Sequence, residues 1–406
     1  MKLDPDKQNW IKEPALVSIM KTIASHGGEA RFVGGAVRDS LLRRAVQDVD
    51  LAVNMPPDVV SDILVKAGFK IVPIGIEHGT IMVVANKKSF EITSLRQDHQ
   101  TDGRHAVVSF TTDWQQDAKR RDFTMNALYA DASGEIYDYF DGLSDIKARH
   151  LRFIGRAQDR IDEDHLRILR YFRFLSQFGE PLLVDQEALA ACRAKAKLIP
   201  TLSAERLWKE LSCLLLGSAV GTTVSLMQEN GIFASFLPQI TDIGRFEDFL
   251  LLEKKHTTPN VVRRLACLLK KDHAATAVTL RLSRKEKEHL IGCSQILPVL
   301  RDVDTASVLR QYLYDTGKEI VTSALLILMA EGDREKETLF STLDEWENPV
   351  FPLNGKNLLE LGLSQGPEMG ALLKSVETWW RGQDFRPLHK NCFEKAKSLV
   401  NADSQG

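Results

Sequence analysis

The sequence predicts an N-terminal α/β domain, built on a mixed sheet, followed by a long all-helical portion. Residues 31–145 alternate between short strands, rich in β-branched residues, and amphipathic helices, which is typical of an α/β domain. After residue 150 apolar residues recur at intervals of three and four, which is the spacing of helices. The chain of 406 residues is too long for a single core. We therefore expect several domains.

The elements of the first domain follow from local patterns. Apolar strands are expected at 30–33, before a glycine turn, and at 48–53, where polar and apolar residues alternate. Helical spacing predicts short helices at 36–44 and 56–68, the second opening on prolines and ending at a glycine. Three further strands are expected at 69–75, 79–86 and 89–96. The domains we expect are an α/β head at 1–147, a helical neck at 148–216, a helical body at 217–348 and a helical tail at 349–406.

Composition limits the functional classes to which the protein can belong. The formal net charge is −2, so a nucleic-acid partner must be held by local basic surfaces. The five cysteines lie far apart without a Cys-x-x-Cys pair, which favours reduced thiols and a cytoplasmic protein. The polar N-terminus lacks a signal core, and no apolar run approaches the roughly 20 residues needed to span a bilayer. We expect no membrane partner, and nothing implies a protein partner.

The stretch "FVGGAVRDSLLRRAVQDVDLAV", residues 32–53, carries the first chemical signal. Side chains two apart on a strand point to one face, so Asp48 and Asp50 would project together, about 7 Å apart. Paired carboxylates suit Mg²⁺ bound to the phosphates of a nucleotide. Glu91, on a neighbouring strand, is a candidate third carboxylate. An isolated Asp-x-Asp is also typical of a solvated strand edge.

The glycine pair Gly34-Gly35 lets backbone N–H groups approach phosphate oxygens, beside the dipole of the helix that follows. The chain has no Gly-x-x-x-x-Gly-Lys-Ser/Thr, which excludes a P-loop NTPase, and no Gly-x-Gly-x-x-Gly after the first strand, which argues against a Rossmann dinucleotide site. A fused phosphohydrolase domain is not expected, because the chain contains no His-Asp dipeptide.

A second polar cluster, Arg120, Arg121, Asp122 and Asn126, lies before a segment that we read as an apolar helix, "FTMNALY". Arginine suits triphosphate oxygens, while Asp and Asn suit ribose hydroxyls. Asp122 is also a candidate cap for that helix.

The ordered motifs "GGAVRD…DVD", "EHGTIMVV", "RRDFTMNALY", "EDHLR" and "SAERLWKEL" resemble those of class II CCA-adding tRNA nucleotidyltransferases, which have a polymerase-β-like head. The resemblance covers residues 31 to about 215. It implies two Mg²⁺ ions held by Asp48 and Asp50, CTP and ATP as substrates, and the acceptor arm and elbow of tRNA as partner. It also implies attack of the tRNA 3′-hydroxyl on the α-phosphate with release of pyrophosphate. The matching nucleotide-binding positions are Gly34, Gly35, Arg38, Asp39, Arg121, Asp122, Asn126, Asp164, Arg167, Arg170 and Arg173.

The segment "EDHLR" suggests how bases are chosen without a template. Asp164 and Arg167 lie three apart, which predicts that they share one face of a helix. A carboxylate only accepts hydrogen bonds and a guanidinium only donates them. Cytosine and adenine both present an amino donor beside a ring-nitrogen acceptor, whereas uracil and guanine present the reverse order. The pair therefore fits C and A and rejects U and G, although a surface ion pair has the same spacing. Glu205, Arg206 and Glu210 are expected to brace this segment.

Two regions are candidates for RNA handling. We expect residues 96–119 to form a mobile loop, in which Asp102, Gly103 and Arg104 are the candidate functional residues; in the family such a loop assists the switch from C to A. Residues 254–287 hold ten Lys or Arg against two carboxylates. A solvated helical face explains this charge equally well. The candidates for contact with the tRNA backbone are Lys254, Lys255, Arg263, Arg264, Lys270, Lys271, Arg284 and Lys285.

Three other functions remain open at this point. Bacterial poly(A) polymerase shares the Asp-x-Asp and Arg-Arg-Asp motifs, although such enzymes are strongly basic and this chain has a pI near 6.6. A tRNA enzyme that adds only A is not excluded by any motif. A non-catalytic RNA-binding protein would not require Asp48 and Asp50 together with Glu91.

Overall fold

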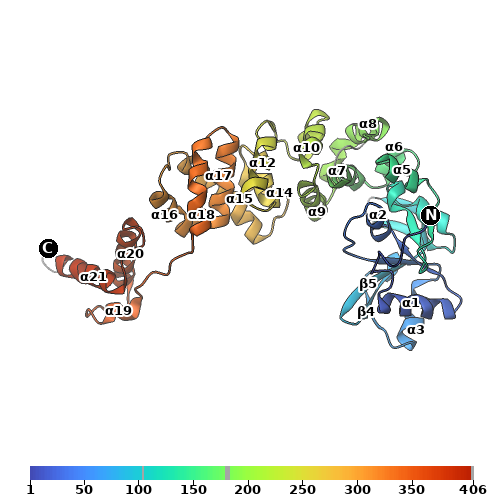
Figure 1. Cartoon of the computed structure of the whole chain (residues 1–406), viewed down its shortest axis with the longest axis horizontal. Helices are drawn as coiled ribbons and strands as arrows, with labels where there is room; N and C mark the ends of the chain where they lie inside the picture. The colour runs from blue at the N-terminus through green and yellow to red at the C-terminus, as the bar shows by residue number, and fades with distance from the viewer. Residues whose placement is uncertain (103–104, 179–182, 404–406) are drawn as a thin grey trace. The chain divides into compact units, whose positions relative to one another are not determined.

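The structure is a computed structural model that describes residues 1–102, 105–178 and 183–403. The chain divides into two compact units, Met1–Pro238 and Gln239–Gly406, each described by itself below (Figure 1). This division falls inside the range 217–348 expected for the body. The four-part organisation stays a prediction.

The head is an α/β domain on a mixed sheet, as the sequence predicts. Its seven-stranded sheet has the order β3-β4-β5-β2-β1-β8-β9, in which β2 and β5 are parallel and the other pairs antiparallel. The strands are β1 (Ala30–Val33), β2 (Asp50–Val53), β3 (Lys70–Pro73), β4 (Thr80–Ala85), β5 (Lys88–Ser94), β8 (Leu128–Ala130) and β9 (Ile136–Asp138). The head helices are α1 (Pro14–Ser25), α2 (Gly35–Leu41), α3 (Pro57–Lys66), η1 (Ile76–His78), α4 (Trp114–Lys119), η2 (Thr124–Asn126) and α5 (Gly142–Ala148).

Both faces of this sheet are covered, and the strand alternation sorts the side chains between them. Phe32 and Leu51 belong to the core that includes the buried faces of α1 and α3, which lie together beside the sheet in Figure 1. Val33 and Ala52 belong to a second core, on the opposite face, with Trp114 of α4. Because alternate residues of a strand share a face, Asp50 points to the same side as Ala52.

The segment 96–119 differs from the expected loop. It forms a two-stranded hairpin of β6 (Arg96–Asp102) and β7 (His105–Phe110), followed by α4. Asp102 ends β6, while Gly103 and Arg104 lie outside the described residues. The helix expected over "FTMNALY" is also wrong: η2 gives way to strand β8, which pairs with β1. The strand expected from residue 48 begins only at Asp50.

The rest of the first unit is helical. Its elements are α6 (Ala157–Glu163), α7 (Leu166–Phe178), α8 (Gln186–Lys195), η3 (Ala196–Thr201), α9 (Ala204–Leu215), α10 (Val220–Glu229) and α11 (Ile232–Phe236). Helix α7 packs against α9 and α10, and its apolar residues, Tyr171 and Phe172 among them, are buried. This packing holds Arg167 and Arg170 of α7 against the segment 120–122 of the head.

Every regular secondary-structure element in the described part of the second unit is a helix. Its elements are α12 (Phe246–His256), α13 (Val261–Leu268), α14 (His273–Thr279), α15 (Arg284–Leu300), α16 (Ala306–Thr316), α17 (Lys318–Ala330), η4 (Arg334–Leu339), α18 (Phe340–Glu345), α19 (Gly355–Leu359), α20 (Pro367–Gly382) and α21 (His389–Asp403). Helix α17 is buried along its whole length from Val321 and forms the centre of this core. Within the described ranges, no helix combines the length and the apolar character needed to cross a membrane.

Candidate active site

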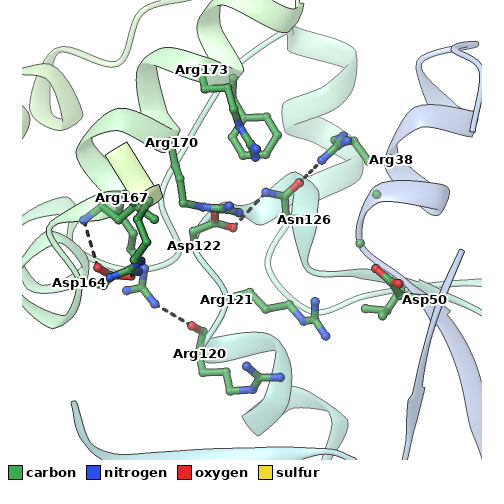
Figure 2. Close-up of a pocket in the computed structure, with 16 residues that line it drawn as sticks. Arg38, Asp50, Arg120, Arg121, Asp122, Asn126, Asp164, Arg167, Arg170 and Arg173 are labelled. Atoms are coloured by element: carbon green, nitrogen blue, oxygen red, sulfur yellow. Dashed lines mark hydrogen bonds and ion pairs between the residues drawn. The ribbon is translucent and has the colours of Figure 1, made fainter. Parts of the chain in front are cut away.

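The site is a cavity of about 400 Å³ between the head sheet and helix α7 (Figure 2). The walls come from the turn between β1 and α2, the start of β2, the segment 120–126, and the helices α7 and α9. Its lining residues are Val33, Gly34, Gly35, Arg38, Asp50, Arg120, Arg121, Asp122, Asn126, Asp164, Leu166, Arg167, Arg170, Arg173, Phe174 and Arg206. All the predicted nucleotide-binding residues are among them except Asp39.

The charge of the cavity suits a polyanion. Seven arginines line it against three aspartates, Asp50, Asp122 and Asp164. A guanidinium presents several donors in a planar fork that matches phosphate oxygens. The excess of arginine therefore favours a ligand with several negative charges, such as a nucleoside triphosphate.

The glycine turn forms one wall. Gly34 adopts a positive φ of 68° at the N-cap of α2, a conformation that other residues rarely take. Arg38, one turn into α2, donates to the Asn126 Oδ1 at 2.6 Å and to both carboxylate oxygens of Asp39. The Asp39 carboxylate thus orients Arg38 and does not line the cavity, and its predicted contact with the nucleotide stays a prediction.

A chain of hydrogen bonds crosses the cavity floor through Asp122 (Figure 2). The Asp122 carboxylate accepts from the Asn126 Nδ2 at 3.0 Å, from the Phe123 N–H at 2.8 Å and from the Arg170 Nε at 2.7 Å. Burial would raise the pKa of Asp122, but Arg170 and these donors lower it to about 2. Asp122 is thus ionised and fixes both Arg170 and Asn126.

Asp164 and Arg167 both reach the cavity, although not from one helix as predicted. Asp164 has extended backbone and ends α6, and Arg167 lies in the first turn of α7. The Asp164 Oδ1 accepts from the Leu166 N–H at 3.1 Å, and its Oδ2 accepts from Arg206 at 2.6 Å. Asp164 is therefore placed by the start of α7 and by α9.

The Arg167 guanidinium is equally fixed. It donates to the Arg160 carbonyl at 2.8 Å and to the Arg120 carbonyl at 3.1 Å, and it pairs with Glu163. Both carbonyl oxygens accept hydrogen bonds from the guanidinium group, so they hold it in one orientation.

Helix α9 braces this end of the site. Glu210, buried at 4% exposure, forms ion pairs with Arg173 at 3.1 Å and Arg170 at 3.6 Å. Arg206, one turn before Glu210 on α9, forms an ion pair with Asp164. The bracing predicted for Arg206 and Glu210 is present, and Arg206 also lines the cavity, which was not predicted.

The three candidate catalytic carboxylates lie at the opposite end. Asp48, Asp50 and Glu91 line a second cavity of about 580 Å³, and Asp50 lines both cavities. The parallel register places Leu51 beside Ile92, so Glu91 lies next to Asp50 on the neighbouring strand. Asp48 lies before the strand and is exposed, so it reaches the site from an irregular segment.

The charges of these carboxylates interact. Burial, the Glu91 carboxylate and the Asp48 carboxylate together raise the pKa of Asp50 to about 6, while Arg121 opposes the shift. Such a cluster favours binding of a cation. Within the described ranges, no three or more His, Cys, Asp or Glu side chains are close enough to hold a metal ion by themselves. Mg²⁺ usually takes one or two carboxylates and completes its shell with phosphates and water, so Asp48 and Asp50 stay candidate ligands.

The predicted RNA-contacting residues divide by burial. Arg263 and Arg264 are 2% and 7% exposed and form ion pairs with the buried Glu253, so their prediction as phosphate contacts is wrong. The remaining six are exposed and stay candidates: Lys254, Lys255, Lys270, Lys271, Arg284 and Lys285.

Two cavity arginines, Arg120 and Arg206, were not predicted as nucleotide contacts. Arg120 lies in the cluster that the sequence singles out. Arg206 lies within "SAERLWKEL", where the spacing on α9 indicated only a bracing role. Their place in the wall depends on packing between segments far apart in the chain.

Two family models match parts of the chain. The model for the Poly A polymerase head domain matches residues 30–152, and the model described as a probable RNA and SrmB-binding site of polymerase A matches residues 183–243.

Similar proteins cover nearly the whole chain. The mouse protein "CCA tRNA nucleotidyltransferase 1, mitochondrial" is 35% identical over 399 residues, which span 95% of this chain and 90% of that protein. The "CCA-adding enzyme" of Lactococcus lactis subsp. cremoris strain SK11 is 33% identical over 368 residues, or 88% of this chain and 90% of that protein.

Two solved structures have the same fold. The Bacillus stearothermophilus CCA-adding enzyme in complex with CTP superposes with a TM-score of 0.76 at 27% identity, over 96% of this chain and 98% of that one. The Thermotoga maritima CCA-adding enzyme complexed with tRNA_CCA gives a TM-score of 0.68 at 18% identity, over 98% of this chain and 97% of that one.

Proposed function

The chain belongs to the family of CCA-adding tRNA nucleotidyltransferases, and from this premise we propose that it adds C, C and A to the 3′ end of tRNA. CTP and ATP are the substrates, no template is used, and pyrophosphate is released. One observation carries the proposal. A single arginine-lined cavity has Asp50 at one end and the fixed pair Asp164 and Arg167 at the other.

The arginine-rich wall gives the nucleotide its orientation. The Gly34-Gly35 turn, Arg38 and Arg121 hold the triphosphate, because backbone N–H groups and guanidinium groups both donate to phosphate oxygens. Asp122 and Asn126 bind the ribose hydroxyls. Arg170 and Arg173, held by Asp122 and Glu210, line the wall between the ribose and the base.

Asp164 and Arg167 select the base. The Asp164 carboxylate accepts from the amino group of cytosine or adenine, and Arg167 donates to the adjacent ring nitrogen. Uracil and guanine place an oxygen against the carboxylate and an N–H against the guanidinium. Each unmade bond to these half-buried groups costs about 1–3 kcal/mol.

Asp48 and Asp50 are the residues to hold two Mg²⁺ ions, with Glu91 as a further carboxylate beside them. When bound, these ions supply charge neutralisation at the leaving pyrophosphate and a lowered pKa for the attacking hydroxyl. The tRNA 3′-oxygen forms a bond to the α-phosphorus, the bond to the pyrophosphate oxygen breaks, and the hydroxyl proton passes to water. Asp50 lies between the two cavities, so it can face both the hydroxyl and the triphosphate.

We further propose that the enzyme acts in the cytoplasm, where thiols are reduced. All five cysteines, each in the described part of the chain, are free, and four of them are buried.

Incubation with Mg²⁺, CTP, ATP and three tRNAs tests the function. The tRNAs end at the discriminator base, at C or at CC. A CCA-adding enzyme completes all three and stops after A. Extension of only the CC-ended tRNA identifies an A-adding enzyme, continued addition of A identifies a poly(A) polymerase, and no extension of any tRNA refutes the proposal.

A further inference from the structure

Asp117 is a buried carboxylate that the proposed mechanism does not use. It lies on α4 at 1% exposure, behind the cavity wall, and does not line the cavity. A buried carboxylate is costly unless it is paired and hydrogen-bonded. Its partners therefore indicate why it is present.

Both oxygens of Asp117 are engaged. The Oδ1 accepts from the Arg120 Nε at 2.8 Å, and the Oδ2 accepts from the Arg121 Nη2 at 3.1 Å and from the Tyr129 hydroxyl at 2.7 Å. Burial alone would raise the pKa of Asp117, but Arg121, Arg120 and Tyr129 hold it well below its ordinary value. Asp117 is thus a fixed negative charge between two arginines that both line the cavity.

Arg121 connects Asp117 to the triphosphate end. Its Nη2 is bound by Asp117 and its Nε lies 3.2 Å from the Tyr129 hydroxyl. The Nη1 lies against the glycine turn, 3.7 Å from the position that a Cβ on Gly34 would occupy. Figure 2 shows Arg121 between Asp122 and Asp50 and extending towards Asp50.

Arg120 connects Asp117 to the base end. While its side chain pairs with Asp117, its backbone carbonyl accepts from the guanidinium groups of Arg160 and Arg167. The adjacent carbonyl, of Arg121, accepts from Arg160 at 2.7 Å. The main-chain carbonyl of Arg120 thus holds Arg167, the base-selecting arginine. The side chain of Arg121 lies against the glycine turn.

We infer that Asp117 is a positioning residue for nucleotide binding, acting through Arg121 on the triphosphate and through Arg120 on the base. This inference rests on the proposed function. Without the carboxylate the two adjacent guanidinium groups repel each other and lose a shared acceptor. An arginine that loses its fixed position loses a hydrogen bond to the triphosphate. Such a bond to a charged group contributes about 1.5–3 kcal/mol, so its loss raises the Kd by roughly tenfold or more.

Asp117→Asn tests this, because the amide keeps the shape and removes the charge. Titration calorimetry with CTP and with ATP, in Mg²⁺ and without tRNA, should give Kd values at least tenfold above wild type for both. Asp117→Glu, which restores the charge, should recover part of the affinity. The KM for tRNA should stay within about twofold of wild type. A general loss of folding would instead lower kcat and the binding stoichiometry without raising the Kd for the nucleotides.

Glu253→Gln is the matched control. Glu253 is also a buried carboxylate between two arginines, Arg263 and Arg264, but it belongs to the second unit and does not line the cavity. It should lower the Tm and leave the Kd for CTP unchanged. If Asp117→Asn likewise lowers only the Tm, Asp117 is merely structural and the inference is overturned.

Two outcomes separate this inference from the proposed function. A wild-type protein that binds CTP but extends none of the three tRNAs refutes the function and leaves the positioning role intact. Extension by wild type, with normal CTP affinity in Asp117→Asn, refutes only the inference. Should Asp117→Asn fail to fold, Tyr129→Phe removes one donor to the carboxylate, and an unchanged Kd for CTP there also overturns the inference.

Discussion

Replacing Arg167 by alanine should weaken the choice of base far more than the binding of triphosphate. Arg167 is held by the carbonyls of Arg160 and Arg120 and by Glu163, so its free donors have one orientation. A wrong base places an N–H against this fixed donor, which costs about 1–3 kcal/mol. Since 1.4 kcal/mol is a factor of ten, the substitution should lower the preference for CTP over UTP by roughly 5- to 150-fold.

The assay is the ratio of kcat/KM for CTP to that for UTP on a tRNA ending at the discriminator base. The KM for CTP should rise by less than about fivefold, because Arg38 and Arg121 are intact. Arg173→Ala is the control on the same helix: Arg173 pairs with Glu210, and its loss should reduce incorporation of CTP and UTP equally. If Arg167→Ala also reduces all nucleotides by the same factor, the pairing argument is wrong.

Three further predictions test other parts of the account. Asp50→Asn should abolish incorporation and leave the Kd for tRNA within about twofold; retained incorporation would place the catalytic carboxylate elsewhere. The folded-state pKa of Asp122 is about 2, against about 4 unfolded, so Asp122 contributes about 2 kcal/mol above pH 4, and this is lost as the pH falls through 2. Denaturant unfolding should therefore show Asp122→Asn destabilised at pH 7 and equal to wild type near pH 2, and a pH-independent difference would contradict the assignment. Lys254→Ala and Lys285→Ala should each lower the salt dependence of tRNA binding by about one ion, whereas Arg264→Ala, at a buried ion pair, should mainly lower the Tm; an unchanged salt slope in both lysine variants would exclude that surface.

The sheet of the head was predictable because its strands carry apolar alternation over a buried face. The hairpin β6–β7 was not, because among the described residues its strands pair with each other and with no strand of the main sheet, and every residue of the first is polar. Strand β8 was read as a helix because "FTMNALY" has no pattern of its own and takes its conformation from pairing with β1.

The site was predictable where chemistry and spacing coincide. Asp50, Asp164 and Arg167 belong to motifs whose residue types and spacing indicate their roles, and all three line the cavity. Burial of Arg263 and Arg264 was not predictable, because a count of charges does not reveal that Glu253 lies within their core. Nor does spacing along the chain reveal that α9 brings Arg206 to Asp164.

The most direct measurement is a crystal structure of this protein with CTP bound. The account predicts the cytosine edge against Asp164 and Arg167, and the triphosphate between the Gly34 turn and Arg121 with its α-phosphate beside Asp50. A base bound away from Asp164 and Arg167, or a triphosphate remote from Asp50, would contradict it.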